Sequence, residues 1–593
     1  MNALVSQIKK ESASVLGSLC GKEISEQDIL LNPIPADFDG DVSVVLFPFV
    51  KSSAKRPDEL GQILGLHLQE HIAFIQKFEV VKGFLNLTFH ARFWKECLQE
   101  IRNAGQAFGI KSAASDAESV LIEYTSPNTN KPLHLGHLRN IFLGQSVSRL
   151  WEAQGKKVIP VCLYNDRGTN ISKSMVAWQR FANGATPAST STKGDHFVGD
   201  YYVKFSEAYK YEVQLGMERG LSEEEAKKQS LLQQEVERLT LAWEAGDPEV
   251  RELWRTMNNW VYEGFKESFD RLGIAFEKSY YESDVYHLGK ETVEEGLKKG
   301  IFYKHEDGSV RIDLQDVGLD EKVLLRSNGT SIYITQDIAV AYKKQKDFQY
   351  DSSVYVVGNE QDYHFKVLFE ILKRLEMKAS DKLYHLSYGM VELPSGKMKS
   401  REGTVVDADV LLDEMEKEAR KTAEEQGKLE NLSEAEKEEL YKMVGNAALR
   451  YFILRVDPKK RMIFNPAESI DFQGQTGPFI QYTHARIRSI LRQGNNSENR
   501  DWANPEGKEI SVISTLQRYP SAVEHAAEKM DPSHLASYVF ELAKEFNQFY
   551  HECPVLKEEN NSKKSLRLEI CRATADVLKK GMYLLGCAVP ERM

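Results

Sequence analysis

Two histidines three residues apart, His134 and His137, lie in a polar loop with Gly136 between them. A helical apolar pattern follows, so both imidazoles are expected on one side of the first helical turn. Imidazole N–H donors at a helix N-terminus suit a reaction in which charge builds up on a phosphate, and the glycine leaves room for a flat group to approach the backbone. A pair of solvated or metal-binding histidines is the alternative, but no cysteine or carboxylate stands at ligand spacing nearby.

The elements around this loop are predicted to be a strand, the loop and a helix. The apolar run at residues 120–122 precedes the loop, and a second run at residues 158–163 follows the helix. Strand, helix and strand at this spacing indicate a βαβ unit in a parallel sheet, which binds ligands at the carboxyl ends of its strands. The sequence contains no P-loop and no Gly-x-Gly-x-x-Gly pattern, so the histidine loop is the candidate phosphate site.

Length and composition limit the class of protein. The 593 residues predict roughly three to four domains at about 150 residues each. The longest apolar run, residues 42–50, is far shorter than a membrane span, and the N-terminus lacks the apolar block of a signal peptide. We therefore expect a cytoplasmic protein with no membrane partner. The six cysteines form no Cys-x-x-Cys pair, so neither a disulfide framework nor a zinc ribbon is indicated.

The charge is unevenly distributed. A formal net charge of −11 argues against indiscriminate nucleic-acid binding but permits a local basic face. Residues 401–440 hold 14 acidic and 6 basic side chains, which is typical of a solvated helical connector, whereas residues 440–500 hold 10 basic and 4 acidic ones. Cations interleaved with aromatic residues in the second stretch suit phosphate contact and stacking on unpaired RNA bases. Plain packing of a helical bundle is the alternative.

A second loop, at residues 396–406, reads Gly-Lys-Met-Lys-Ser-Arg-Glu-Gly-Thr-Val-Val. Lysine, hydroxyl and glycine in a short loop can clamp a triphosphate, because the lysine neutralises charge and the glycines allow the backbone to approach. A basic surface turn would have the same composition.

The motifs together resemble a known family. Residues 126–139 read Ser-Pro-Asn-Thr-Asn-Lys-Pro-Leu-His-Leu-Gly-His-Leu-Arg. They resemble the first signature of class I aminoacyl-tRNA synthetases, His-Ile-Gly-His, in the form found in arginyl-tRNA synthetases. The second loop resembles the second signature, Lys-Met-Ser-Lys-Ser, without its second lysine. Residues 447–450, Ala-Ala-Leu-Arg, resemble the Asp-Ala-Leu-Arg motif of the family's anticodon-binding domain, with alanine for the acid. The resemblance is dense from about residue 119 to 593 and thinner before.

The resemblance implies a role for each motif residue. The implied catalytic residues, on the ATP phosphates and the leaving pyrophosphate, are His134, His137, Lys131 and Lys397. The implied ATP-binding residues are Leu135, Gly136, Met398, Lys399, Ser400 and Arg401. The implied arginine pocket consists of Glu123, Asn128, Tyr333, Asp337 and Gln361. The implied tRNA-binding residues are Arg450, Tyr482, His484 and Arg486.

The chemistry of the arginine pocket agrees with this assignment, since a guanidinium needs carboxylates and Glu123 and Asp337 supply them. Each pocket residue taken singly could instead be a surface or helix-cap residue. Because the second signature lacks a lysine, Lys131, Lys397, Lys399 and Arg401 all remain candidates for the pyrophosphate contact.

The implied fold is α/β and multidomain, with a Rossmann-like parallel-sheet catalytic core, an N-terminal α/β domain and a C-terminal all-α helical bundle. The expected boundaries are 1–112 for an N-terminal domain that touches the corner of the tRNA, 113–400 for the catalytic domain with a helical insertion at about 181–257, 401–442 for the acidic connector and 443–593 for the anticodon-binding domain. For the N-terminal region, where helical patterns near 3–18 and 57–71 flank apolar runs at 42–49 and 84–89, a docking or packing domain is the alternative.

The implied reaction joins L-arginine to tRNA(Arg) with cleavage of ATP. Magnesium is expected to enter with ATP, no tightly bound metal or organic cofactor is expected, and the chain is expected to be a monomer. Activation in this family commonly needs bound tRNA, so the same dependence is expected here. A nucleotidyltransferase acting on a smaller molecule would have no use for the basic C-terminal region. A non-catalytic tRNA-binding relative would be free to lose the histidines or Lys131, and a cysteine-specific synthetase would want zinc ligands.

Overall fold

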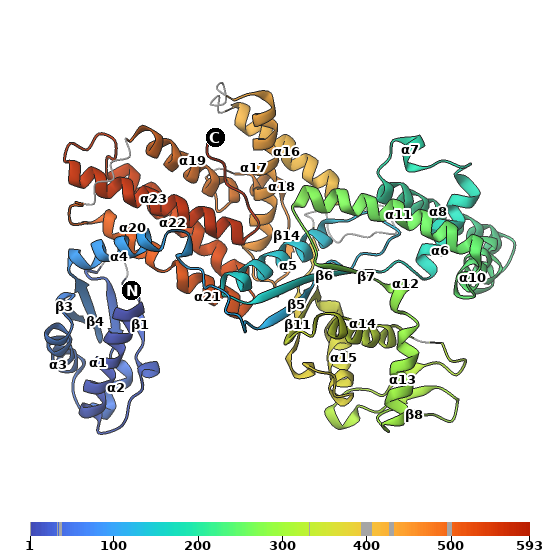
Figure 1. Cartoon of the computed structure of the whole chain (residues 1–593), viewed down its shortest axis with the longest axis horizontal. Coiled ribbons are helices and arrows are strands. Elements are labelled where there is room, and N and C mark those ends of the chain that lie inside the picture. Colours follow the sequence, from blue (N-terminus) through green and yellow to red (C-terminus); the bar gives the residue numbers. More distant parts are fainter. Residues whose placement is uncertain are drawn as a thin grey trace.

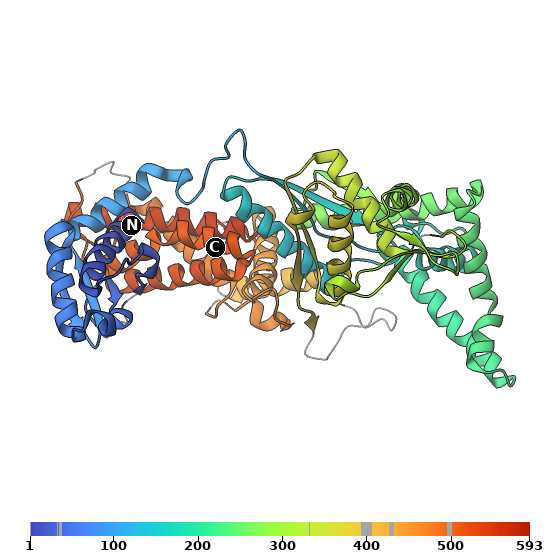
Figure 2. The same ribbon diagram turned by 90° about the horizontal axis from the view of Figure 1, so that it is seen from below.

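The chain is elongated, with the central sheet between an N-terminal domain and helical bundle on one side and an arm of helices on the other (Figures 1 and 2). The structure, a computed structural model, describes residues 2–32, 34, 38–330, 332–392, 406–425, 432–471, 473–494 and 501–593. None of the described helices is long and apolar enough to cross a membrane.

The N-terminal domain is an antiparallel sheet covered by helices. Its strands have the order β1-β2-β4-β3. Its elements are α1 (Asn2–Cys20), β1 (Leu31–Asn32), β2 (Val42–Val45), α2 (Phe47–Ser53), α3 (Pro57–His71), β3 (Ile75–Val81), β4 (Phe84–Phe89) and α4 (Ala91–Ala104). The patterns near 3–18, 57–71 and 84–89 are confirmed as α1, α3 and β4. The run at 42–49 divides instead, because Pro48 suits the first turn of a helix and ends the strand.

The central sheet has the strand order β12-β11-β5-β6-β7, and each neighbouring pair is parallel. Its strands are β5 (Ser119–Glu123), β6 (Lys157–Tyr164), β7 (Lys278–Tyr281), β11 (Ser352–Gly358) and β12 (Leu383–Tyr388). The helix α5 (Leu135–Ala153) connects β5 to β6, which confirms the predicted βαβ unit.

Residues of β5 alternate between the two faces of this sheet. Val120 and Ile122 belong to the same core cluster as Leu138 and Ile141 of α5. Leu121 packs in another cluster with Val340 of α14 (Tyr333–Phe348). Both faces of the strand are therefore covered by helices, and its carboxyl end is held in a fixed place.

A helical arm lies between β6 and β7, as expected from the polar sequence at 181–257. Its helices are α6 (Thr169–Phe181), α7 (Pro187–Thr190), α8 (Gly194–Glu218), α9 (Glu223–Gln229), α10 (Leu231–Glu244) and α11 (Pro248–Leu272). The long return helix α11 begins where the Asp247 side chain accepts a hydrogen bond from the Val250 N–H at 3.0 Å, and it ends at Gly273 with φ of 62°.

Between β7 and β12 the chain adds a small antiparallel sheet and its helices. These elements are α12 (Glu282–Val285), α13 (Leu288–Lys298), β8 (Tyr303–Lys304), β9 (Val310–Ile312), β10 (Lys322–Leu325) and α15 (Asp362–Arg374). The helices α14 and α15 pack with β9 and β10 in a core of their own. The first turn of α14 thereby lies at the carboxyl edge of the central sheet.

The C-terminal region is a helical bundle (Figure 1). Its elements are β13 (Val391–Glu392), α16 (Ala408–Glu425), α17 (Glu434–Leu454), β14 (Met462–Ile463), α18 (Pro466–Ser469), α19 (Gly477–Gln493), α20 (Lys508–Gln517), α21 (Tyr519–Lys529), α22 (Pro532–Glu552) and α23 (Asn561–Leu584). Large side chains such as Tyr451, Tyr519 and Phe546 are fully buried in it. The acidic stretch forms α16 and the start of α17.

Candidate active site

The histidine loop follows β5 and ends as the N-cap of α5. Nδ1 of His134 accepts the backbone N–H of Gly136 at 3.1 Å, and Nδ1 of His137 accepts the backbone N–H of His134 at 3.0 Å. The two rings stack with centroids 3.8 Å apart. Because each Nδ1 accepts, the proton of each neutral ring resides on Nε2. Both Nε2–H groups are therefore donors available at the start of the helix.

The electrostatic environment keeps both rings neutral. Burial, together with the positive charge of Lys131, lowers the pKa of His134 to about 3. Burial also lowers the pKa of His137 well below its usual value, and His134 and Lys131 add to that effect. Burial likewise lowers the pKa of Lys131. At neutral pH the loop thus offers two uncharged N–H donors beside a lysine.

Gly136 is needed for this geometry. A Cβ atom at this position would lie 3.0 Å from Cε1 of His134, closer than a side chain normally packs. Beside the loop is a cavity of about 280 Å³, lined by Lys131, His134 and residues of α8 and α16. The cavity and the Nε2–H donors make this loop suitable for binding an anion.

The second basic loop lies largely outside the described residues, and so do its predicted site residues Lys397, Met398, Lys399, Ser400 and Arg401. The described residues that flank it do reach the histidine loop. At its last residue, the Leu135 N–H donates to the Val406 carbonyl at 3.0 Å, and just after it the Ala408 N–H donates to the Leu133 carbonyl at 3.0 Å. Before it, Arg139 of α5 donates to the Met390 carbonyl at 3.4 Å. The fold therefore anchors both flanks against the N-terminal half of α5.

The predicted arginine-binding residues gather at the carboxyl edge of the sheet but differ in environment. Tyr333 is 81% exposed, and Asn128 and Gln361 are exposed as well. Glu123 is buried at the end of β5, where Lys344 of α14 donates to it. The Glu123 charge is paired with Lys344 in this structure, and its role in the arginine pocket stays a prediction.

Asp337 is the predicted carboxylate that remains accessible at this edge. It lies one turn into α14, and Nε2 of His364 is 2.7 Å from its Oδ2. The negative charge of Asp337 also raises the pKa of a second acid, Glu282, which directly follows β7. The pKa of Glu282 is raised to about 7, chiefly by burial; Arg167 opposes this shift, and Asp166 and Asp337 add to it.

Glu282 is a further candidate site residue that the sequence reasoning missed. With its amide oriented to suit both partners, Gln336 donates to Glu282 Oε1 at 2.8 Å and accepts from Arg167 Nη1 at 3.0 Å. Two acids from adjoining elements thus lie close enough to interact at the end of the sheet, and a pair of carboxylates suits a guanidinium. The available signal was an acid placed directly after a strand, the same signal that singled out Glu123.

Comparison with known proteins agrees with this geometry. Residues 99–465 match the family described as tRNA synthetases class I (R), catalytic domain, and residues 480–593 match the DALR anticodon binding domain. An arginine–tRNA ligase of Bacteroides thetaiotaomicron is 48% identical over 98% of both chains, and one of Bacteroides fragilis is 50% identical over 98% of both. The chain belongs to the arginine–tRNA ligase family. The arginyl-tRNA synthetase structure of Thermus thermophilus covers 99% of both chains with a TM-score of 0.80 at 26% identity.

Two of the four predicted tRNA-binding residues are buried in this family member. Arg450 is 1% exposed, donates to Gln145 of α5 and the Leu272 carbonyl of α11, and stacks 4.4 Å from the Phe142 ring. His484 is 1% exposed, with Nδ1 2.9 Å from the Pro590 carbonyl. In this structure Arg450 joins the bundle to the catalytic domain and His484 holds the C-terminal segment, and direct RNA contact by either residue stays a prediction.

The other two predicted residues are less buried, and their contact with RNA also stays a prediction. Arg486 and Tyr482 are half-buried on α19, with the guanidinium 4.7 Å from the centre of the tyrosine ring. Arg486 also donates to Asn547 Oδ1 at 2.8 Å. A cation stacked on an aromatic ring at the bundle surface suits an RNA backbone and base.

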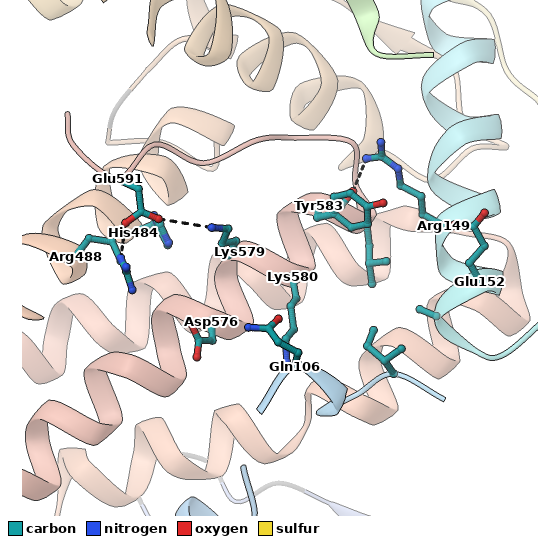
Figure 3. A pocket seen from close by; sticks show the side chains of 13 residues that line it. Gln106, Arg149, Glu152, His484, Arg488, Asp576, Lys579, Lys580, Tyr583 and Glu591 are labelled. Atoms are coloured by element: carbon teal, nitrogen blue, oxygen red, sulfur yellow. Dashed lines mark hydrogen bonds and ion pairs between the residues drawn. The ribbon is translucent and has the colours of Figure 1, made fainter. Parts of the chain in front are cut away.

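A larger cavity, of about 720 Å³, lies where the bundle meets the end of α5 and the segment after α4 (Figure 3). Basic side chains line part of it, including Arg149, Lys579 and Lys580, and Lys580 donates to the Gly105 carbonyl at 2.5 Å. Among the described residues, none of those predicted to bind phosphate or arginine lines this cavity. It marks the junction of the three regions rather than the phosphate site.

Proposed function

We propose that the chain performs the reaction of its family at the histidine loop, joining L-arginine to its tRNA with cleavage of ATP. In the first step an arginine carboxylate oxygen attacks the α-phosphorus of ATP, the bond to the β-phosphate breaks, and arginyl-adenylate and pyrophosphate form. In the second step a hydroxyl of the 3′-terminal ribose attacks the arginyl carbonyl and AMP leaves. Neither step needs a nucleophilic side chain, so catalysis is by positioning and charge stabilisation.

The observation that carries this proposal is the pair of neutral imidazoles with Nε2–H donors at the start of α5. His134 and His137 donate to the ATP phosphates as charge develops at the α-phosphorus, and the N–H groups of Leu135 and Gly136 add to the positive end of the helix. Lys131 neutralises the leaving pyrophosphate together with the basic residues 397–401.

Magnesium enters as the ATP complex. Asp200 and Asp407, which line the cavity beside His134, offer the carboxylate oxygens that magnesium prefers, so the lining fits a magnesium–ATP substrate. When bound, the ion supplies charge neutralisation for the leaving pyrophosphate.

Arginine binds at the adjoining edge of the sheet. Asp337 and Glu282 meet the guanidinium, and the exposed Tyr333, Asn128 and Gln361 surround the rest of the amino acid. Glu123 supports this site through its buried ion pair with Lys344 of α14, since α14 also carries Tyr333 and Asp337.

The tRNA binds along the C-terminal bundle, with Arg486 and Tyr482 on its surface and Arg450 transmitting the position of the bundle to α5 and α11. The support is the match of residues 480–593 to an anticodon-binding domain and the interdomain contacts of Arg450.

The test is charging of bulk tRNA with each of the twenty amino acids, combined with ATP–pyrophosphate exchange with and without tRNA. Formation of arginyl-tRNA alone supports the proposal, and charging with a different amino acid contradicts it. Exchange that proceeds equally well without tRNA would remove the expected tRNA dependence of activation and leave the assignment of the reaction intact.

A further inference from the structure

A charged cluster connects the helical arm to the chain segment that pairs with the histidine loop. His196 of α8 has its Nε2 atom 3.2 Å from Oδ2 of Asp409 and 3.4 Å from Oδ2 of Asp407. Lys193, just before α8, has its Nζ 2.6 Å from the same Asp409 oxygen. Figure 1 shows that α16, which begins beside Asp407 and Asp409, reaches from the bundle to the end of α11.

Backbone contacts attach Asp407 and its two neighbours to the histidine loop. Asp407 forms an antiparallel bridge with His134, and hydrogen bonds from Leu135 to Val406 and from Ala408 to Leu133 flank the bridge. The Asp407 side chain also accepts the N–H groups of Asp409 at 2.8 Å and Val410 at 3.1 Å, so it fixes the first turn of α16. A shift of Asp407 therefore shifts the backbone of His134.

Residues of the cluster also form hydrogen bonds with α11, the long helix of the arm. Lys193 donates to Ser268 of α11 at 2.5 Å, and Arg271 of α11 donates to the Asp409 carbonyl at 3.4 Å. The side chains of His196, Lys193 and Asp409 are 28%, 18% and 19% exposed, so bulk water screens their interactions only partly. His196 and Asp407 also line the same cavity as Lys131 and His134.

The charges that face His196 are those of Lys193, Asp195, Asp200, Asp407 and Asp409. The hydrogen bond to Asp409 raises the pKa of His196, with Asp407 and Asp195 acting in the same direction against burial and Lys193. Burial alone would raise the pKa of Asp409, but the bonds from His196 and Lys193 lower it overall. Both shifts favour an ion pair between a protonated His196 ring and an ionised Asp409.

The cluster is not arranged for a metal ion. Asp195, His196 and Asp409 offer ligand atoms within 4.8 Å of one another. The Lys193 ammonium, however, lies 3.3 Å from Asp195 Oδ2 and 2.6 Å from Asp409 Oδ2, and it already takes the place of a cation there.

We propose that His196 is a positioning residue for adenylate formation: its ring holds Asp407 and Asp409 and so fixes the backbone that carries His134 at the ATP phosphates. The proposal rests on the function proposed above for the histidine loop. It assigns the helical arm a part in the first chemical step, in addition to any contact that the arm makes with tRNA.

The test compares His196→Ala and His196→Gln with wild type in tRNA-supplemented ATP–pyrophosphate exchange. His196→Ala should raise the KM for ATP or lower kcat by on the order of ten- to a hundredfold, because small displacements of catalytic groups cost that much. The KM for arginine should stay within about twofold. The acids proposed to bind the guanidinium, Glu282 and Asp337, follow β7 and lie on α14, not on the elements of this cluster. His196→Gln keeps an N–H donor toward one carboxylate and should recover part of the loss.

Asp413→Asn is the matched control. Asp413 lies one turn further along α16 and pairs with Arg271 at 2.7 Å, so its loss loosens α16 without touching Asp407. It should leave ATP kinetics unchanged. Asp409→Asn should reproduce the ATP defect, which keeps the proposal testable if His196→Ala fails to fold.

Several results would overturn the proposal: ATP kinetics of His196→Ala within twofold of wild type, an equal loss for Asp413→Asn, or an equal rise in the KM for arginine. Wild-type protein that shows no arginine-dependent exchange would instead refute the proposed function, so the two failures are distinguishable.

Discussion

Replacing His137 by alanine tests the central chemical claim. The substitution removes the Nε2–H donor and also the Nδ1 acceptor of the His134 N–H. Loss of one donor that acts on developing charge typically lowers the rate by about 10² to 10³, or about 2.7–4 kcal/mol. The ring also stacks on His134 at 3.8 Å, so part of the loss comes from a less ordered His134. We therefore expect a fall in kcat at the upper end of that range.

The assay is arginine-dependent ATP–pyrophosphate exchange with tRNA present, with kcat and both KM values measured from pH 6 to 8. Glutamine is the matched control, because its amide keeps both a donor nitrogen and an oxygen that can accept the N-cap N–H of His134, but it lacks the imidazole ring that stacks on His134. His137→Gln should therefore lie between alanine and wild type. The KM for arginine should be nearly unchanged in both variants, since the acids proposed to bind the guanidinium follow β7 and lie on α14, whereas His137 lies on α5.

The pH dependence provides a second check. Because burial lowers the pKa of His137 well below its usual value, the ring is already neutral at pH 6. The kcat ratio of wild type to alanine should therefore stay constant from pH 6 to 8. A ratio that rises toward low pH would mean that the protonated ring of His137 stabilises the developing phosphate charge. That outcome, or a loss of arginine affinity equal to the loss of kcat, would refute the assignment of neutral donors to the phosphates.

Four further predictions concern the acids at the edge of the sheet and two arginines of the bundle. Asp337→Ala should raise the KM for arginine by about tenfold or more with ATP kinetics unchanged, because a charged hydrogen bond is worth about 1.5–3 kcal/mol; an unchanged KM would exclude the guanidinium contact. Glu282 has its pKa raised to about 7, so the KM for arginine should fall as pH rises through 7 and the acid ionises, and Glu282→Gln should flatten this dependence. Arg450→Ala should lower the thermal unfolding midpoint by a few degrees, since each buried acceptor it leaves unpaired costs about 1–3 kcal/mol. Arg486→Ala should instead raise the KM for tRNA with the midpoint nearly unchanged, and exchanged outcomes for these two arginines would contradict their assignment.

The βαβ unit and the phosphate loop could be predicted because each depends on neighbouring residues. The apolar run before the loop, the helical spacing after it and the His-x-Gly-His pattern are local in sequence, and α5 begins directly after His134. The protonated nitrogen of each ring could not be predicted. It is fixed by which backbone N–H the Nδ1 atom accepts, and that depends on the backbone conformation of the N-cap.

The environments that could not be predicted from the sequence are those set by distant elements. Arg450 stands in a basic, aromatic stretch that is typical of an RNA-binding surface. In the fold its partners are Gln145 and the Leu272 carbonyl, 305 and 178 residues away along the chain. Glu123 likewise pairs with Lys344, 221 residues further on. Composition can indicate a charge, but only the packing of domains decides whether that charge faces solvent or a buried partner.

Arg450 connects the helical bundle to the elements around α5. The charged cluster of Lys193, His196, Asp407 and Asp409 at the start of α16 connects the same two parts of the molecule. Burial lowers the pKa of Arg450 to about 10, and its guanidinium contacts α5 and α11, whereas α16 contacts α11 through Arg271 and the histidine loop through Asp407. A tRNA that shifts the bundle must therefore move α5 along with the segment that pairs with His134. Because both connections end on the helix that carries the phosphate donors, a dependence of adenylation on tRNA has a direct structural route in this fold.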